Sequence, residues 1–224
     1  MNRSLRWIGT MLAVAACAAP AEEGLQSDQQ KFSYAIGLQV TQSILRQGVA
    51  IDADAFSLAV QDAVAGSQPR LKGDEMARIM EQQQKQATGR LREMAKQNAT
   101  KGRSFLDKNR QRPDVKVLES GLQYRVVRAG TGPRPKADSM VTVNYVGTLI
   151  DGREFDSSAR HNEPAKFQVN GVIPGWSEAL QLMPVGSKWQ LFVPPELAYG
   201  ARGAGAVIGP NETLVFDVEL LSIN

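Results

Sequence analysis

The hydrophobic spacing of this chain changes from helical to mostly alternating at Arg112-Pro113. Before this point, apolar residues recur every three or four positions, as they do on amphipathic helices. From Val115 onward they alternate with mostly polar neighbours, which is typical of half-buried antiparallel strands. The residue before a proline is disfavoured in the helical region, so Arg112 marks the end of a helix. The sequence therefore predicts an α+β chain in which a helical part precedes a β-rich part, residues 113–224.

Residues 1–21 have the features of a secretory signal peptide. Arg3 and Arg6 precede an apolar run that is too short to span a bilayer. Ala19-Pro20-Ala21 offers a cleavage site, whereas the four residues that end at Cys17 resemble a bacterial lipobox, in which the cysteine is lipidated. The two processing routes stay open at this point, and both predict an exported protein.

The first predicted helix begins at Ser27, which forms a capping box with Gln30. The helix has apolar residues on two sides: one stripe contains Phe32, Ile36, Val40 and Ile44, and the other Tyr34, Leu38 and Leu45. A helix that is apolar on two sides has more surface to bury than one neighbouring helix covers. We therefore expect an intertwined homodimer through residues 27–65, with a small monomeric bundle as the alternative.

Two more helices are expected before the change in spacing. One extends from Asp52 as N-cap to Gly66 just past its end. A long third helix is expected to be capped by Asp74 and to bridge solvent between two bodies, because its second half is mostly polar and charged. Gly89 and Gly102 each weaken this helix by about 1 kcal/mol relative to alanine, so bending is expected there.

The β-rich part combines several strands with one short helix. Alternating residues predict strands around Leu122–Val126, Val141–Tyr145, Leu191–Val193 and Leu214–Leu220, and Asp151-Gly152 is a hairpin signal. A helix is expected over 175–183, directly after Pro174, with Trp176 on its apolar face. The predicted organisation is an N-terminal signal peptide (1–21), a helical dimerisation domain (22–71), a connecting helix (72–112), and a curved antiparallel sheet wrapped over one short helix (113–224).

Composition excludes several classes of site. The chain has 26 Lys plus Arg against 23 Asp plus Glu, and without the first 21 residues the balance becomes 24 against 23. We therefore expect no nucleic-acid partner. A single cysteine and a single histidine rule out a disulfide framework within the chain and argue against a His/Cys metal site.

Six segments follow one another in order over roughly residues 115–224: Tyr145-Val146-Gly147, Asp151-Gly152, Phe155 to Ser158, Val172 to Trp176, Pro194 to Gly200 and Thr213 to Leu220. Together they resemble the FKBP-type peptidyl-prolyl cis-trans isomerases. The segments Phe32 to Gly37, Ser120 to Tyr124 and Glu178 to Pro184 further resemble the macrophage infectivity potentiator group of Gram-negative bacteria. This resemblance implies an FKBP-like fold and a location in the periplasm or on the outer-membrane surface.

The resemblance also assigns residues to roles. It implies a substrate pocket formed by Tyr145, Phe155, Val172, Trp176 and Phe216, and catalytic roles for Asp156, Tyr199 and the backbone N–H of Ile173. Proline-containing polypeptides would be the substrates and macrolides such as rapamycin the inhibitors, with no cofactor or metal needed. The chain departs from human-type members at His161, Ala165 and Ala204, which leaves substrate preference open. The alternative function is that of a dimeric periplasmic chaperone or surface binding protein whose isomerase activity is incidental.

Overall fold

The computed structural model describes residues 24–46 and 48–224. The expected signal peptide and the Cys17 lipobox lie outside the described residues. No helix in the described ranges has the length and apolar character needed to cross a membrane. The chain divides into two compact units between Leu58 and Ala59.

The first two helices begin as the sequence predicts. Helix α1 (Asp28–Arg46) follows the capping box, in which the Ser27 N–H donates to Gln30 Oε1 at 2.9 Å and the Gln30 N–H donates to Ser27 Oγ at 3.2 Å. Helix α2 (Ala53–Val64) begins after Asp52, whose Oδ1 accepts from the Ala55 N–H at 2.8 Å. None of the side chains of α1 is buried within the single chain, so its apolar stripes are free to meet a partner.

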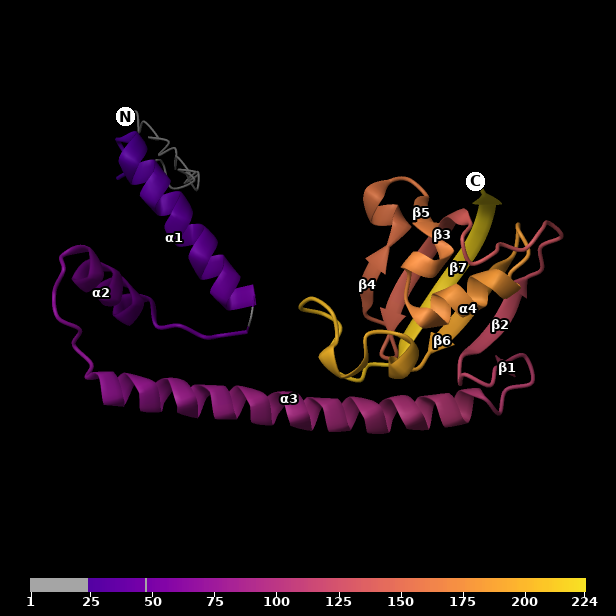
Figure 1. Ribbon diagram of the computed structural model, residues 1–224, viewed down its shortest axis with the longest axis horizontal. Helices are drawn as coiled ribbons and strands as arrows, with labels where there is room; N and C mark the ends of the chain where they lie inside the picture. The colour runs from indigo at the N-terminus through magenta and orange to yellow at the C-terminus, as the bar shows by residue number, and fades with distance from the viewer. Residues whose placement is uncertain (1–23, 47) are drawn as a thin grey trace, which may run out of the picture. The chain divides into compact units, whose positions relative to one another are not determined.

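Helix α3 (Gly73–Asn109) is one continuous helix (Figure 1). The prediction that Asp74 caps it is wrong, because the N-cap is Lys72 and makes no side-chain capping bond. Asp74 lies instead in the first turn, where a negative charge is favoured by the helix dipole. The helix ends close to the predicted boundary at Arg112.

The expectation that α3 is solvated through its second half is wrong for its last turns. Phe105 packs against Phe192, with ring centroids 5.9 Å apart. The buried amide of Asn109 donates to Gln123 Oε1 at 2.9 Å, and Gln123 Nε2 donates to the Leu106 carbonyl at 3.1 Å. Besides Gly102 and Asn109, this packed face has only Phe105 and Leu106 as large apolar side chains, too few to stand out as a stripe in the sequence.

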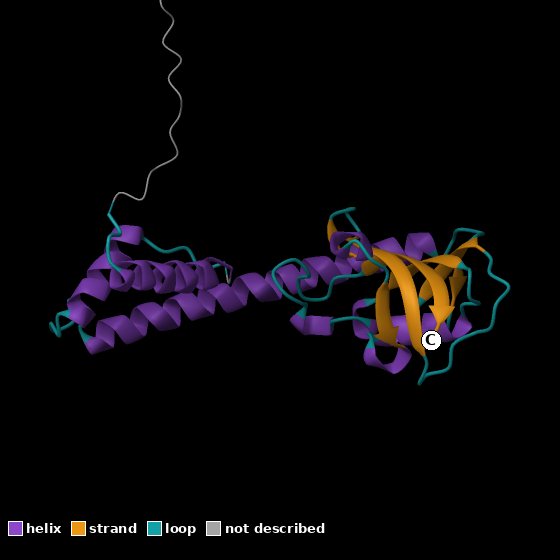
Figure 2. Cartoon of the chain, turned by 90° about the horizontal axis from the view of Figure 1, so that it is seen from above, coloured by secondary structure: helices purple, strands orange, loops and turns teal. Residues whose placement is uncertain are grey.

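The β-rich part forms one curved antiparallel sheet (Figure 2) with the strand order β1-β2-β6-β7-β3-β4, and β5 pairs with β3. The strands are β1 (Lys116–Val117), β2 (Gln123–Arg128), β3 (Met140–Leu149), β4 (Glu154–Ser157), β5 (Ala165–Gln168), β6 (Lys188–Val193) and β7 (Leu214–Ile223). Short 3-10 helices occupy the connections: η1 (Ser158–His161), η2 (Val169–Gly171), η3 (Pro195–Leu197) and η4 (Gly200–Arg202). The predicted hairpin at Asp151-Gly152 joins β3 to β4.

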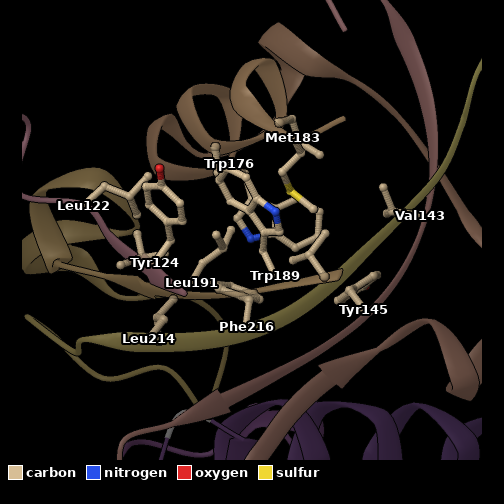
Figure 3. Packing of buried hydrophobic residues seen from close by; sticks show 14 of the residues in the cluster. Leu122, Tyr124, Val143, Tyr145, Trp176, Met183, Trp189, Leu191, Leu214 and Phe216 are labelled. Atoms are coloured by element: carbon tan, nitrogen blue, oxygen red, sulfur yellow. The ribbon is translucent and has the colours of Figure 1, made fainter. Parts of the chain in front are cut away.

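The core lies between the sheet and helix α4 (Pro174–Leu182), which packs on the inner face of the curve (Figure 1). Alternate residues of β3 and β7 face this helix and are buried, as their spacing predicts. Figure 3 shows the side chains of Trp176 and Met183 meeting those of Leu191 and Phe216. The predicted fold class, a helical N-terminal region followed by a curved antiparallel sheet over one short helix, is confirmed.

Candidate active site

A cavity of about 500 Å³ opens beside the start of α4. Strands β3, β4, β5 and β7 supply its walls, and the segment before η4 supplies Tyr199 at its edge. The lining residues are Tyr145, Phe155, Asp156, Phe167, Gly171, Val172, Ile173, Trp176, Tyr199 and Phe216. Most of these side chains are aromatic or aliphatic, so the cavity suits an apolar group of modest size.

Aromatic rings meet edge to face around Trp176, which is only 2% exposed. The ring centroid of Tyr145 lies 5.4 Å from that of Trp176 at 86°, and that of Phe216 lies 5.2 Å away at 82°. Phe167 makes a third such contact at 5.8 Å and 89°. Perpendicular pairs of this kind are favoured because the positive edge of one ring meets the negative face of the other. These contacts hold the indole rigidly in the cavity wall.

Gly147 leaves space for two aromatic rings that line the cavity, those of Phe155 and Phe216. A Cβ at this position would lie 2.7 Å from the ring of Phe155 and 2.9 Å from that of Phe216. These two rings pack edge to face across it, with centroids 5.5 Å apart. Any side chain larger than hydrogen would therefore push one ring out of place.

Ile173 is the N-cap of α4, with extended backbone, and Pro174 opens the helix. The Ile173 N–H donates to no backbone group among the described residues, as is usual for groups at a helix start. The start of α4 is tied to the neighbouring η2 segment by Ser177, whose Oγ donates to the Val169 carbonyl at 2.6 Å. The N–H beside the cavity is thus held in place and available to a ligand carbonyl.

One hydrogen bond fixes the polar side of the cavity. The Tyr145 hydroxyl donates to Asp156 Oδ2 at 2.6 Å. Burial, and then this bond to the carboxylate, raise the pKa of Tyr145 above its ordinary value. Burial, followed by the charge of Asp156, also raises the pKa of Tyr199. Both phenols therefore keep their protons at neutral pH, and the Tyr199 hydroxyl is a neutral donor at the cavity edge.

The structure brings together every residue that the sequence singled out for the site. Asp156, Tyr199 and Ile173 lie in the same cavity as Tyr145, Phe155, Val172, Trp176 and Phe216. Their chemical roles stay predictions. Phe167 and Gly171 also line the cavity and were missed, although Phe167 follows the departure at Ala165 by two positions and so points to the same side of β5.

Asp156 is hydrogen-bonded to Tyr145, and the nearby cation Arg160 has other partners. Arg160 donates to the Phe155 carbonyl at 2.8 Å and lies 3.2 Å from Glu154 Oε1. The side chain of His161 is outside what the structure describes. Within the described ranges, no group of His, Cys, Asp and Glu side chains is arranged to hold a metal ion.

Comparison with known proteins agrees with this geometry. Residues 132–221 match the family model of the FKBP-type peptidyl-prolyl cis-trans isomerases. Residues 29–126 match the model of the domain amino terminal to FKBP-type peptidyl-prolyl isomerase. The chain belongs to the FKBP-type peptidyl-prolyl cis-trans isomerases. This membership, and the isomerase class that it carries, confirm the expectation from the sequence.

Individual relatives of this FKBP-type isomerase span nearly its whole length. It is 44% identical over 212 residues to the outer membrane protein MIP of Legionella longbeachae, covering 93% of this chain and 91% of that protein. It is 47% identical over 192 residues to the FKBP-type 22 kDa peptidyl-prolyl cis-trans isomerase of Escherichia coli, covering 85% and 93% respectively. The crystal structure of FkpA from Escherichia coli superposes with a TM-score of 0.63 at 39% identity, covering 89% of this chain and 98% of that one.

The raised pKa of Tyr145 predicts the pH behaviour of this FKBP-type isomerase. Because a raised pKa favours the neutral phenol, the bond to Asp156 should persist through pH 10 and be lost only as the pH rises further. We expect the difference in tyrosinate absorbance at 295 nm between the wild type and Tyr145→Phe to appear only above the ordinary tyrosine range near pH 10. A difference that titrates at or below pH 10 would contradict the assigned hydrogen bond.

Proposed function

We propose that this isomerase accelerates rotation about X-Pro bonds in exported proteins by binding the twisted prolyl amide in the Trp176 cavity, without covalent chemistry. Rotation is slow because resonance gives the C–N bond double-bond character, with a barrier of about 18–20 kcal/mol. The planar amide is more polar than the twisted one, which has lost that resonance. A cavity walled by apolar rings therefore favours the twisted form, and this differential binding lowers the barrier.

In this proposal, the apolar residues of the cavity give it its shape, and its few polar groups orient the substrate. Trp176 would lie under the prolyl ring, with Tyr145, Phe155, Val172 and Phe216 as walls. The Ile173 N–H and the Tyr199 hydroxyl would hold carbonyls of the substrate, so that only the prolyl bond turns. Asp156 would orient the cavity through Tyr145. The observation that carries this proposal is the set of edge-to-face rings around Trp176, in a cavity whose lining also includes Ile173, with its free N–H, and Tyr199, with its neutral hydroxyl.

The carboxylate and the hydroxyl can be tested separately. Asp156→Ala leaves the Tyr145 hydroxyl without its acceptor, a loss of about 1–3 kcal/mol, so kcat/KM for a short X-Pro peptide should fall by about 5- to 150-fold. Tyr199→Phe removes one hydrogen bond and should lower it by about 2- to 10-fold. A protease-coupled peptide assay measures both, with the exposed Asp138→Ala as control.

The outcome also separates the isomerase from a chaperone. If Asp156→Ala folds normally and retains wild-type kcat/KM, the assigned roles are wrong. If it loses peptide isomerisation but still speeds the proline-limited refolding of a test protein as well as the wild type does, then holding unfolded chains is the main activity.

Rapamycin at saturating concentration should inhibit peptide isomerisation by the wild type, since it would occupy the same cavity.

We further propose that α1 forms a homodimer interface within residues 27–65. Phe32 is 61% exposed and Ile36 45% exposed in the single chain, which supports a partner that covers this stripe. Ile36→Glu would place a charge in that interface, and we expect a monomer by sedimentation at micromolar concentration, with peptide isomerisation unchanged. Gln42→Glu, at an exposed position on neither apolar stripe, should stay dimeric. A dimer in Ile36→Glu would place the interface elsewhere.

We propose that the protein is exported to the periplasm or the outer-membrane surface. The basic start and apolar run of residues 1–21 support this, as does a relative whose name is outer membrane protein MIP. Mass spectrometry of the mature protein distinguishes the two processing routes. A free Glu22 amino terminus indicates signal cleavage after Ala21, and an acylated Cys17 indicates a lipoprotein. An unprocessed Met1 would contradict export by this segment.

A further inference from the structure

The segment between Tyr199 and β7 forms a loop that begins beside the cavity. The loop doubles back on itself through an isolated bridge, in which the Ala204 N–H donates to the Ile208 carbonyl at 2.9 Å and the Ile208 N–H donates back at 3.2 Å. It closes where the Asn211 N–H donates to the Gly200 carbonyl at 2.9 Å. Gly200 directly follows Tyr199, so the closure of the loop sets the position of that side chain.

The C-terminal third of α3 holds this loop at its closing end. Asn98 Nδ2 donates to the Pro210 carbonyl at 3.0 Å. In the opposite direction, Asn211 Nδ2 donates to the Ala95 carbonyl at 3.5 Å. Asn211 therefore bonds to the helix through its side chain and to Gly200 through its backbone. These contacts join the helix to the residue next to Tyr199 in two steps.

Gly102 lets the helix come this close. It is buried, and a Cβ on it would lie 2.3 Å from Thr213 Oγ1 and 3.2 Å from Thr213 Cβ. Thr213 is 1% exposed, and its Oγ1 makes no hydrogen bond within the described ranges. The glycine thus has a packing role, whereas Gly89 in the same helix has no atom within 4 Å of its would-be Cβ. The sequence had suggested that both positions weaken the helix in the same way.

We propose that Asn98 and Gly102 of α3 are positioning residues for the isomerase site, and that they act by fixing the 200–213 loop and hence Tyr199. This inference rests on the proposed role of Tyr199 in holding substrate. It makes the end of the connecting helix part of the active-site structure, although no residue of α3 lines the cavity.

The two glycines provide a matched experiment in the full-length protein. Both Gly102→Ala and Gly89→Ala should raise the helix propensity of α3, but only Gly102→Ala pushes the helix away from Thr213. We expect Gly102→Ala to lower kcat/KM for an X-Pro peptide by a factor of about 3 to 30, and Gly89→Ala to leave it unchanged. Adding Thr213→Ala to Gly102→Ala removes the clashing oxygen and should restore most of the activity.

Two further readouts separate positioning from a general loss of structure. In a Tyr199→Phe background, Gly102→Ala should have a smaller effect than in the wild type, because the group that it displaces is already gone. Hydrogen exchange measured by mass spectrometry should be faster over residues 200–213 in Gly102→Ala than in Gly89→Ala. If the two glycine variants have equal activity, or if the loss is the same with and without the Tyr199 hydroxyl, the proposal is overturned.

Failure of the proposed role of Tyr199 gives a different result from failure of the positioning proposal. If Tyr199→Phe has wild-type activity, the role of Tyr199 in holding substrate is wrong, the positioning role that rests on it is overturned as well, and hydrogen exchange then tests only the structural link between α3 and the loop. Faster exchange over 200–213 in Gly102→Ala supports the link between α3 and the loop. Equal exchange in the two variants removes it.

Discussion

The edge-to-face packing of aromatic rings against Trp176 is the contact on which both the fold and the site depend. Helix α4 is short, and an isolated helix of this length is not stable in water. It persists because Trp176, Leu180 and Met183 are buried against the sheet. Each ring pair around the indole contributes about 0.5–1.5 kcal/mol beyond the area that it buries. The same rings that attach the helix to the sheet also form the walls of the cavity, so the site cannot be loosened without weakening the core.

The polar groups that line the cavity are few. The Tyr145 hydroxyl donates its hydrogen bond to the Asp156 carboxylate. Tyr199 keeps its own proton, and Ile173 offers a backbone N–H at the start of α4. Donors of this kind suit a reaction in which no bond is made or broken, because they can hold a peptide without exchanging protons with it. In the proposed function the cavity is therefore a site of selective binding, in which shape and low polarity would act on the prolyl amide.

Features with strong local signals could be predicted from the sequence, and those that depend on distant contacts could not. The alternation in β3 and β7, the capping box at Ser27 and the hairpin at Gly152 are encoded by neighbouring residues, and all are found in the structure. The site residues were found through family resemblance, because nothing in their spacing distinguishes a cavity wall from a core. Phe167 was missed because β5 is too short to show a period. The docking of Asn98 and Gly102 was missed because a polar residue and a glycine carry no apolar pattern.

The position of β7 in the sheet has a consequence for how the protein is made. This strand comes last among the described strands, yet it lies between β6 and β3 and pairs with both. Until residues 214–223 have been synthesised, the pair β2–β6 and the group β3–β4–β5 have no shared partner to join them. A ribosome-bound chain that lacks this segment therefore cannot complete the sheet, and the domain closes only when its last strand arrives.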